Sequence, residues 1–242
     1  MEFKVYLSEG YYNCRCKGGG TVAQVVFKRY EKKYILTGSQ YEAFIAKTSH
    51  RLMQDRYGNH TVCNIYFDTD NYALIRKSIE KPAYKEKLRL RSYGVPTSSS
   101  HVFLEIKKKF DGIVYKRRVE MTLDEAYRYI YEREKADEGQ ILNEIDYFLD
   151  FHKPEPKIFL AYDRIALLGR DNPCLRVTFD TNVRWRDEKI GLENGAWGNV
   201  MVDEGTYIME IKFPDAMPVW LCEVLDELRI YVFDMGDALF LL

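Results

Sequence analysis

The chain has 242 residues, of which 46% are hydrophobic and 30% charged, and its formal net charge is −1 at pH 7. This composition permits a substantial core, and the near-zero net charge excludes a protein that recruits nucleic acid through a global basic field. No apolar run approaches the roughly 18 residues of a membrane span. The first residues also lack the apolar stretch of a signal peptide, so we expect a cytoplasmic protein.

The predicted elements begin after an N-terminal extension over residues 1–22, which has no sustained period and ends near a run of three glycines. A single domain is expected over residues 23–242. Its first half is predicted to contain a strand over 25–36, a helix capped by Thr37 or Ser39, a strand over 62–68, a helical turn near 74–75, and strands over 84–93, 101–110 and 113–121. Asp111-Gly112 between the last two strands is a strong signal for a two-residue hairpin.

The second half is predicted to alternate helices and strands. Thr122, with Glu125 three residues later, has the pattern of a capping box at a helix start. The remaining elements are a helix over 140–151, strands over 157–168, 174–184 and 206–213, and a helix over 218–228. These make at least eight strands, mostly antiparallel by connection length, and predict an α+β fold.

Cysteine usage points to a reducing compartment. Cys14 and Cys16 lack the second pair of ligands that a zinc site needs. Cys63, Cys174 and Cys222 lie in apolar stretches, so we expect reduced core residues.

The most informative pattern is the alternation of cations along a predicted strand. Lys85, Lys87, Arg89 and Arg91 are two residues apart and therefore share one face, with leucines between them facing the other way. Similar alternation recurs in further predicted strands. The residues on the corresponding faces of those strands are Arg29, Glu31, Lys33, Glu105, Lys107, Lys109, Lys116, Arg118, Glu120, Arg164, Arg176, Thr178, Asp180, Glu210 and Lys212.

For any one strand, a solvated outer face explains such a pattern. Here the pattern recurs in many strands, Lys and Arg dominate it, and it would place like charges opposite one another. These three observations favour a bound anion instead. Guanidinium groups match phosphoryl oxygens bidentately, and the few carboxylates beside them are hard ligands for Mg²⁺ or Mn²⁺. The simplest geometry is a closed antiparallel β-barrel with a charged lumen and helices packed outside.

Other phosphate and nucleophile chemistries are not supported by the sequence. The four histidines are scattered, without a neighbouring Ser or Cys that would form a nucleophilic pair. Gly18-Gly-Gly20 lacks the spacing and the Lys of a P-loop. An enzyme of this kind would act on phosphates by positioning and by charge neutralisation.

Eight short motifs add a family resemblance. In order, they are Arg29-Tyr-Glu-Lys-Lys-Tyr34, Tyr66-Phe-Asp-Thr69, Lys87-Leu-Arg-Leu-Arg-Ser-Tyr93, Phe103-Leu-Glu-Ile-Lys107, Lys116-Arg-Arg118, Tyr162-Asp-Arg164, Arg176-Val-Thr-Phe-Asp180 and Glu210-Ile-Lys212. Over most of its length the chain resembles the polyphosphate polymerase (VTC, vacuolar transporter chaperone) domain, a branch of the triphosphate tunnel metalloenzymes. The resemblance implies a tunnel barrel, ATP and inorganic polyphosphate as substrates, and Mn²⁺ or Mg²⁺ as cofactor.

The resemblance also implies roles for individual residues. The implied phosphate-binding residues are Lys33, Arg89, Arg91, Lys107, Lys116, Arg164 and Arg176, and Glu210 is the implied metal ligand. The alternation along the strands places Lys87, Arg118 and Lys212 on the same face as further candidates. Lys85, near the start of its strand, is expected near an entrance of the tunnel. Arg29 stands where the related hydrolases have the first Glu of a Glu-x-Glu-x-Lys signature, which favours the polymerase-like branch.

Three functions remain open from the sequence. The first is a polyphosphate polymerase that transfers the γ-phosphate of ATP to a growing chain, and the second is a triphosphate or polyphosphate hydrolase of the same fold. The third is a non-catalytic polyphosphate-binding module, because the family's C-terminal Ser-Lys pair is replaced by Asp234 and Met235. Neither a nucleic-acid partner nor a transmembrane segment is expected, and the sequence is compatible with a homo-oligomer.

Overall fold

The computed structural model describes residues 29–80, 82–111, 113–134 and 139–233. The predicted extension over residues 1–22, and also Asp234 and Met235, lie outside the described residues. The chain divides into two compact units, which are described separately. Within the described residues, the first unit comprises 29–60, 163–182 and 202–233, and the second comprises the rest.

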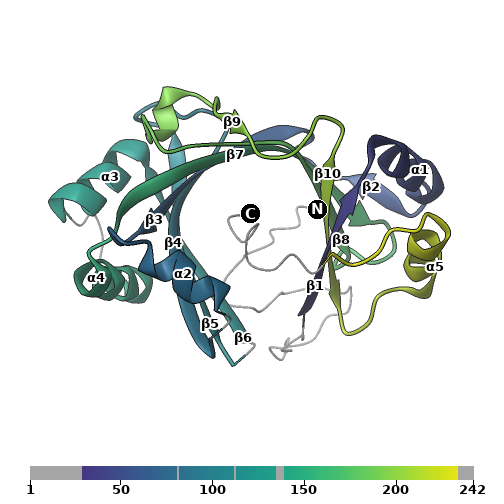
Figure 1. Ribbon diagram of the computed structural model, residues 1–242, viewed down its shortest axis with the longest axis horizontal. Helices are drawn as coiled ribbons and strands as arrows, with labels where there is room; N and C mark the ends of the chain where they lie inside the picture. The colour runs from purple at the N-terminus through teal and green to yellow at the C-terminus, as the bar shows by residue number, and fades with distance from the viewer. Residues whose placement is uncertain (1–28, 81, 112, 135–138, 234–242) are drawn as a thin grey trace, which may run out of the picture. The chain divides into compact units, whose positions relative to one another are not determined.

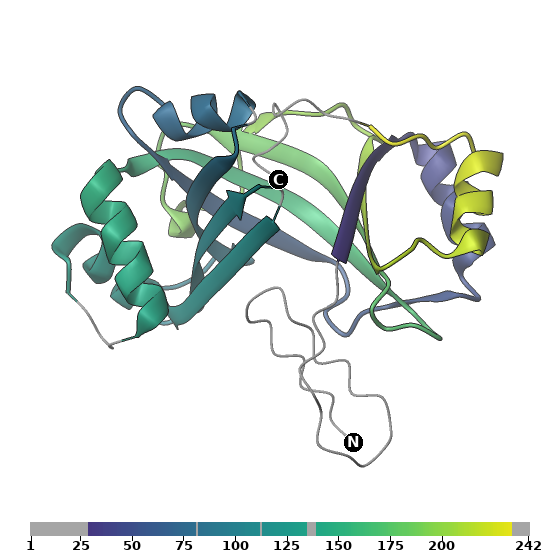
Figure 2. The same cartoon turned by 90° about the horizontal axis from the view of Figure 1, so that it is seen from below.

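The first unit contains five of the described strands, and it shares two of them with the second unit. Its elements are β1 (Arg29–Leu36), α1 (Gly38–Thr48), β2 (Leu52–Gln54), the later part of β7 (Glu155–Gly169), the earlier part of β8 (Arg176–Arg186), β10 (Tyr207–Pro214) and α5 (Val219–Glu227). Helices α1 and α5 lie side by side (Figures 1 and 2), joined by the ion pair of Lys47 with Glu227 at 2.7 Å. Of the two N-cap candidates, Thr37 rather than Ser39 caps α1, through a capping box with Gln40.

The second unit is built on a run of long strands. Its elements are β3 (His60–Asp68), α2 (Ala73–Ile79), β4 (Tyr84–Tyr93), β5 (His101–Phe110), β6 (Ile113–Thr122), α3 (Leu123–Tyr127), a π-helical turn (Arg128–Glu132), α4 (Gln140–His152), a 3₁₀ turn (Leu192–Asn194) and β9 (Asn199–Val200), with the remaining parts of β7 and β8. Asp111 has a left-handed φ of 45° and Phe110 pairs with Ile113, so the predicted two-residue hairpin is confirmed. Thr122 and Glu125 form the predicted capping box.

The helices of each unit cover one face of its strands. In the second unit, Leu88, Leu90 and Leu104 are fully buried in one cluster with Ile145 and Phe148 of α4. Full burial of such a side chain contributes roughly 1.5–3 kcal/mol. The opposite face of the same strands carries Lys87, Arg89, Arg91, Lys107 and Lys116, so the alternation in the sequence assigns these residues to the correct face.

In the first unit, Phe44 of α1 and Leu221 of α5 are buried with the strand residues Phe179, Met209 and Ile211. No helix in the described part of the chain is long and apolar enough to cross a membrane.

The strands follow the hydrogen-bonded order β1-β10-β8-β7-β3-β4-β5-β6, with β2 on β7 and β9 on β8. An α+β fold with an antiparallel sheet is confirmed. The predicted closure is wrong, because no pairing among the described residues joins β1 to β6. Strand parity is the same in an open and in a closed sheet, so the alternation of charge contained no information on closure.

The boundaries differ from the predictions in small ways. Strand β7 begins two residues before the predicted start, and the short strands β2 and β9 were not predicted. All three described cysteines are reduced thiols, but only Cys63 is buried. Cys174 lies in the turn before β8 and is half-buried, and Cys222 is exposed on α5, so the expected core placement of these two is wrong. An amphipathic helix has an apolar stripe, and Cys222 falls outside that stripe.

Candidate functional site

In the second unit, the face of β4 away from the helices carries its cations. Arg91 is buried there, and Arg89 keeps 17% of its side chain exposed. Lys87 is half-buried. Lys85, expected near an entrance, is instead buried and donates through Nζ to the Ser78 carbonyl at 3.1 Å. The short helix α2 therefore covers the start of the line of cations along β4.

Three lysines from three neighbouring strands stand directly opposite one another. Lys87 of β4 pairs in register with Lys107 of β5, and Lys107 pairs in register with Lys116 of β6. We call these three residues the lysine row. Side chains directly opposite in an antiparallel pair have Cβ atoms about 4.5–5.5 Å apart, and like charges at such positions destabilise the sheet. An anion bound across the row would relieve this repulsion.

A single buried carboxylate lies beside the lysine row. Glu105 is 2% exposed and stands in register with Arg89 on one side and Arg118 on the other. Its Oε2 lies 2.7 Å from Arg89 Nε, and its Oε1 lies 3.0 Å from Lys116 Nζ. Arg91 Nη1 is 4.0 Å from Oε2. One carboxylate therefore orients three cations and neutralises only part of their charge.

The charges around Glu105 determine its protonation. Burial alone would raise the pKa of Glu105, but Arg89, Arg91 and Lys116 outweigh it and hold that pKa below its ordinary range. The Glu105 carboxylate is therefore ionised at every pH at which the protein would work.

Neutral side chains from β3 and β7 fix the two arginines. Arg91 donates through Nε to Asn64 Oδ1 at 2.8 Å and through Nη2 to the Tyr162 hydroxyl at 3.0 Å. Asn64 in turn donates to the Leu160 carbonyl at 3.1 Å. Arg89 donates through Nη1 to the Tyr66 hydroxyl at 2.9 Å. The charge pattern of the sequence gave no roles to Asn64, Tyr66 and Tyr162, although Asn64 and Tyr66 alternate with buried residues of β3 and so share its polar face.

The remaining candidate of the second unit is Arg118. Its guanidinium carbon lies 4.6 Å from the ring centroid of Phe103, which precedes Glu105 on the same face of β5. The second unit thus brings together six predicted residues on one face, namely Lys87, Arg89, Arg91, Lys107, Lys116 and Arg118.

The first unit contains a different charge pattern, in which both signs alternate. Glu210 of β10 stands in register with Lys33 of β1, and Lys212 stands in register with Glu31. Glu210 is 8% exposed and is ion-paired with Lys212. Lys212 Nζ also lies 3.7 Å from Glu31 Oε2. Burial would raise the pKa of Glu210, but Lys212, a hydrogen bond with Glu31, and Lys33 hold that pKa well below its ordinary range.

Two more predicted arginines of the first unit are held by carboxylates. Arg164 forms a bidentate pair with Asp180, in which Nε–Oδ1 and Nη2–Oδ2 are both 2.6 Å. Arg176 donates through Nη2 to Asp55 Oδ2 at 3.3 Å. The sequence placed Asp180 on this face but did not find Asp55, which follows the unpredicted strand β2.

The residues around Glu210 include oxygen ligands of the kind that a divalent cation needs. No group of three or more His, Cys, Asp or Glu side chains suited to a metal occurs among the described residues. Glu31 and Glu210 nevertheless both contact the same ammonium, Lys212 Nζ. Thr178, in register with Glu210, has a buried hydroxyl for which the described residues provide no hydrogen-bond partner. Two carboxylates and a hydroxyl are hard oxygen donors that fit Mg²⁺ or Mn²⁺, whose other ligands are usually water and phosphate.

Comparison with known proteins identifies a family and structures of similar fold. The model of the VTC domain family matches residues 28–233. Among solved structures, a candidate adenylate cyclase from Bacillus halodurans is 14% identical with a TM-score of 0.51, covering 84% of this chain and 90% of that one. A candidate adenylyl cyclase from Hippeastrum, described as having a dominant triphosphatase activity, is 15% identical with a TM-score of 0.50, covering 88% and 94%. These two likenesses show the fold alone, and no curated protein matches the chain.

Proposed function

We propose that this chain, which belongs to the VTC domain family, is a metal-dependent polyphosphate polymerase that transfers the γ-phosphate of ATP to a growing inorganic polyphosphate chain. The observation that carries the proposal is the lysine row beside Arg89 and Arg91. Three lysines in direct register repel one another, and the pairing of Lys116 with Glu105 offsets only part of this repulsion, so an anion bound across the row would stabilise the folded protein. A chain of phosphates supplies repeated negative charge along such a face.

The arginines retain donors for phosphate. A guanidinium has five N–H groups, and Arg89 uses three of its nitrogens for Glu105 and Tyr66. The N–H groups left over, together with the ammonium of Lys116, would bind the transferred phosphoryl group. Glu105, Asn64 and Tyr162 would act as positioning residues, since they fix the guanidinium planes before the substrate arrives.

The proposed reaction is an in-line phosphoryl transfer. A terminal phosphate oxygen of the polyphosphate chain attacks the γ-phosphorus of ATP, the bond from that phosphorus to the β–γ bridging oxygen breaks, and ADP leaves. No covalent intermediate on the protein is needed. Fixed cations reduce the barrier because negative charge spreads over the oxygens in the transition state. In this scheme Arg89, Arg91, Lys107, Lys116, Arg164 and Arg176 are the proposed catalytic residues.

In the first unit, Lys33 and Lys212 are proposed to bind substrate phosphates. Glu210, with Glu31 and Thr178, is proposed to hold Mn²⁺ or Mg²⁺. When bound, the metal would supply a Lewis acid that neutralises phosphate oxygens.

Hydrolysis is the second candidate function. It is favoured by the triphosphatase activity described for the Hippeastrum protein of the same fold. The same cations would then bind the triphosphate, and water would replace the polyphosphate chain as acceptor.

Incubation of the full chain with ATP and Mn²⁺, followed by separation of the products on a polyacrylamide gel, tests the proposal. The polymerase produces long polyphosphate together with ADP, whereas free phosphate without chains would overturn it in favour of hydrolysis. Tight polyphosphate binding without any product would indicate a binding module. Arg117→Ala is the matched control for Arg89→Ala, because Arg117 faces the helix side, where it pairs with Glu144. Only Arg89→Ala should lose product.

A further inference from the structure

The helix side of the second unit carries exposed aromatic rings at the end of β4, β5 and β6 that lies near the β5–β6 hairpin. The rings come from these three strands and from α4, and each residue is between 37% and 68% exposed. We call this set the aromatic patch, and its members are Tyr84, Phe110, Tyr115, Tyr147 and Phe151. Large contiguous apolar surfaces are rare on monomeric proteins and often mark a binding site.

The strand residues of the patch lie side by side. Tyr84 of β4 stands in register with Phe110 of β5, so their side chains are neighbours on the same face. Tyr115 of β6 stands in register with Lys108 of β5. Lys108 in turn pairs with Glu144 of α4 at 3.3 Å. The strand part of the patch therefore reaches the side of α4.

Helix α4 supplies the rest of the patch. Tyr147 and Phe151 are one helical turn apart, and their rings stack with centroids 5.8 Å apart and an angle of 10° between the planes. Burial, a hydrogen bond to Glu86 and the nearby Tyr147 raise the pKa of Tyr84. The rings of α4 and of β4 are therefore close enough to form one surface.

The charged side chains that join α4 to the strands are paired with one another. Glu144 contacts both Lys108 and Arg117, and His152 Nε2 lies 2.8 Å from Glu86 Oε1. These groups leave no excess of cations for anionic lipid and no excess of carboxylates for a basic peptide. A partner that is itself aromatic and uncharged at the contact suits this surface best.

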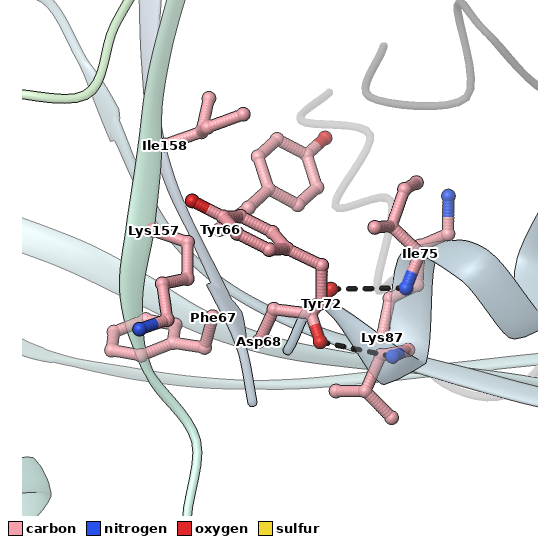
Figure 3. A pocket seen from close by; sticks show the side chains of 9 residues that line it. Tyr66, Phe67, Asp68, Tyr72, Ile75, Lys87, Lys157 and Ile158 are labelled. Carbon is pink, nitrogen blue, oxygen red and sulfur yellow. Dashed lines mark hydrogen bonds between the residues drawn. The ribbon is translucent and has the colours of Figure 1, made fainter. Parts of the chain in front are cut away.

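Helix α2 borders the patch and is fixed in place. Asp68 accepts hydrogen bonds from the backbone N–H groups of Leu74 and Ile75, each at 2.9 Å, and Figure 3 shows the contact with Ile75. The same helix places Lys77 Nζ 5.7 Å from the ring centroid of Tyr84, within reach of a cation–π contact. Rings that are held before a partner arrives lose less conformational entropy on binding.

The size of the patch suits a dimer of this chain. Full burial of an aromatic side chain removes roughly 150–250 Å² from water. With their exposed fractions, the five residues would bury about 500 Å² on each copy. A standard interface buries roughly 800 Å² on each partner. The aromatic patch alone therefore supplies more than half of one side of such an interface.

We propose that two copies of this chain form a two-fold symmetric dimer in which the aromatic patch of one copy packs on the same patch of the other. A two-fold contact buries the same residues on both copies. Aromatic rings suit such a contact because they attract one another in offset-stacked and edge-to-face arrangements. A second copy also presents the same paired charges, so no unpaired charge has to be buried.

The dimer leaves the cationic face uncovered. The aromatic patch lies on the helix side of β4, β5 and β6, whereas the lysine row lies on the opposite face of the same strands. Disruption of the dimer should therefore leave the affinity of each chain for tripolyphosphate unchanged.

Sedimentation velocity of the full chain over a range of concentrations, without phosphate ligands, tests the dimer. The informative variant combines Tyr147→Gln with Phe151→Gln, because both residues are exposed on α4 and glutamine is a good helix former. We expect a wild-type dimer, and a dissociation constant at least about thirtyfold higher in the double variant, since buried aromatic residues dominate interfaces. The far-ultraviolet circular dichroism spectrum should not change.

Tyr131→Gln is the matched control. Tyr131 is an exposed tyrosine of the same unit, and its ring packs beside Tyr127, with centroids 5.7 Å apart, outside the aromatic patch. This variant should dimerise as the wild type does.

Three outcomes would overturn the dimer. A wild-type chain that is monomeric at every concentration would do so, and so would a dimer that persists in the double variant, because its interface would then lie elsewhere. A monomer that binds vesicles of phosphatidylcholine and phosphatidylglycerol through Tyr147 and Phe151 would instead assign the patch to a membrane surface. Since the dimer is measured without phosphate, its failure and the failure of the proposed polymerase are independent results.

Discussion

Arg89 holds the Glu105 carboxylate through two nitrogens, Nε and Nη2, both 2.7 Å from Oε2. Glu105 is therefore both a competitor of phosphate for the cations and the group that keeps them in place. Its position between Arg89 and Arg118 on neighbouring strands allows a dense cationic face to exist in the free protein.

Glu105→Gln should destabilise the free protein and increase its stabilisation by ligand. Removing the charge leaves Arg89, Arg91 and Lys116 without their shared carboxylate, at a cost of about 2 kcal/mol, because the cluster is partly solvated. Tripolyphosphate should then raise the melting temperature of the variant more than that of the wild type. Thermal melts with and without tripolyphosphate measure both effects.

The matched control is Glu120→Gln, because Glu120 is exposed on the same face of β6 and contacts the exposed His101 at 3.2 Å. Its melting temperature should not change. A higher melting temperature for Glu105→Gln without ligand would contradict the role given to Glu105.

The stability that Glu105 contributes should depend on pH with a definite sign. Because its pKa is lower in the folded than in the unfolded protein, the contribution is complete above the unfolded pKa of about 4.3. It is lost as the pH falls toward the folded pKa. The difference in stability between wild type and Glu105→Gln, measured by denaturant melts, should be constant from pH 7 to about 5.5 and should shrink below about pH 4. A difference that grows on acidification would reverse the sign and contradict the ion-pair assignment.

Arg91→Lys should lose function although it keeps the charge. A lysine lacks the planar fork that donates to Asn64 and to Tyr162. We expect weaker tripolyphosphate binding by about tenfold and a loss of stability of about 1–3 kcal/mol from the unsatisfied partners. Titration calorimetry and denaturant melts report the two effects separately, and wild-type behaviour in both would show that the fork is dispensable.

The alternation of residues along a strand determines which parts of this site could be predicted from the sequence. The period of two placed Arg89 and Glu105 on one face because that period is a local property of an extended strand. The two-residue hairpin fixes the opposition of Lys107 and Lys116, because loop length sets the register of a hairpin. A longer loop joins β4 to β5, so the opposition of Lys87 and Lys107 was visible only in the structure. Asn64 was missed for a related reason, since a neutral amide has no charge pattern to distinguish it.

Alternation shows which cations share a face but not which partners each cation has. The structure instead gives Arg91 three partners in the second unit, namely Asn64, Tyr162 and Glu105, so its loss removes more attraction than repulsion. Likewise, the burial of Lys85 against α2 depends on a contact with Ser78 that strand parity does not reveal.

Lys107→Ala should weaken phosphate binding without destabilising the fold. Lys107 is exposed at the centre of the lysine row, between two other cations, so its removal relieves repulsion in the free protein. We expect tripolyphosphate to bind roughly three- to tenfold less tightly, with a smaller salt dependence, because one ion contact is lost. Lys108→Ala is the control, since Lys108 faces the helix side and pairs with Glu144 at 3.3 Å. Equal losses of affinity in the two variants would show that only net charge matters.

Glu210→Gln should impair metal binding in particular. The variant keeps the shape of the side chain but removes the charge that pairs with Lys212 and that would hold Mn²⁺. Electron paramagnetic resonance of free Mn²⁺ measures the occupancy directly, and we expect the apparent dissociation constant to rise at least tenfold. Glu223→Gln, an exposed carboxylate on α5 in the same unit, is the matched control and should bind Mn²⁺ as the wild type does. An unchanged Mn²⁺ affinity of Glu210→Gln would remove Glu210 from the metal site and leave it as a structural partner of Lys212.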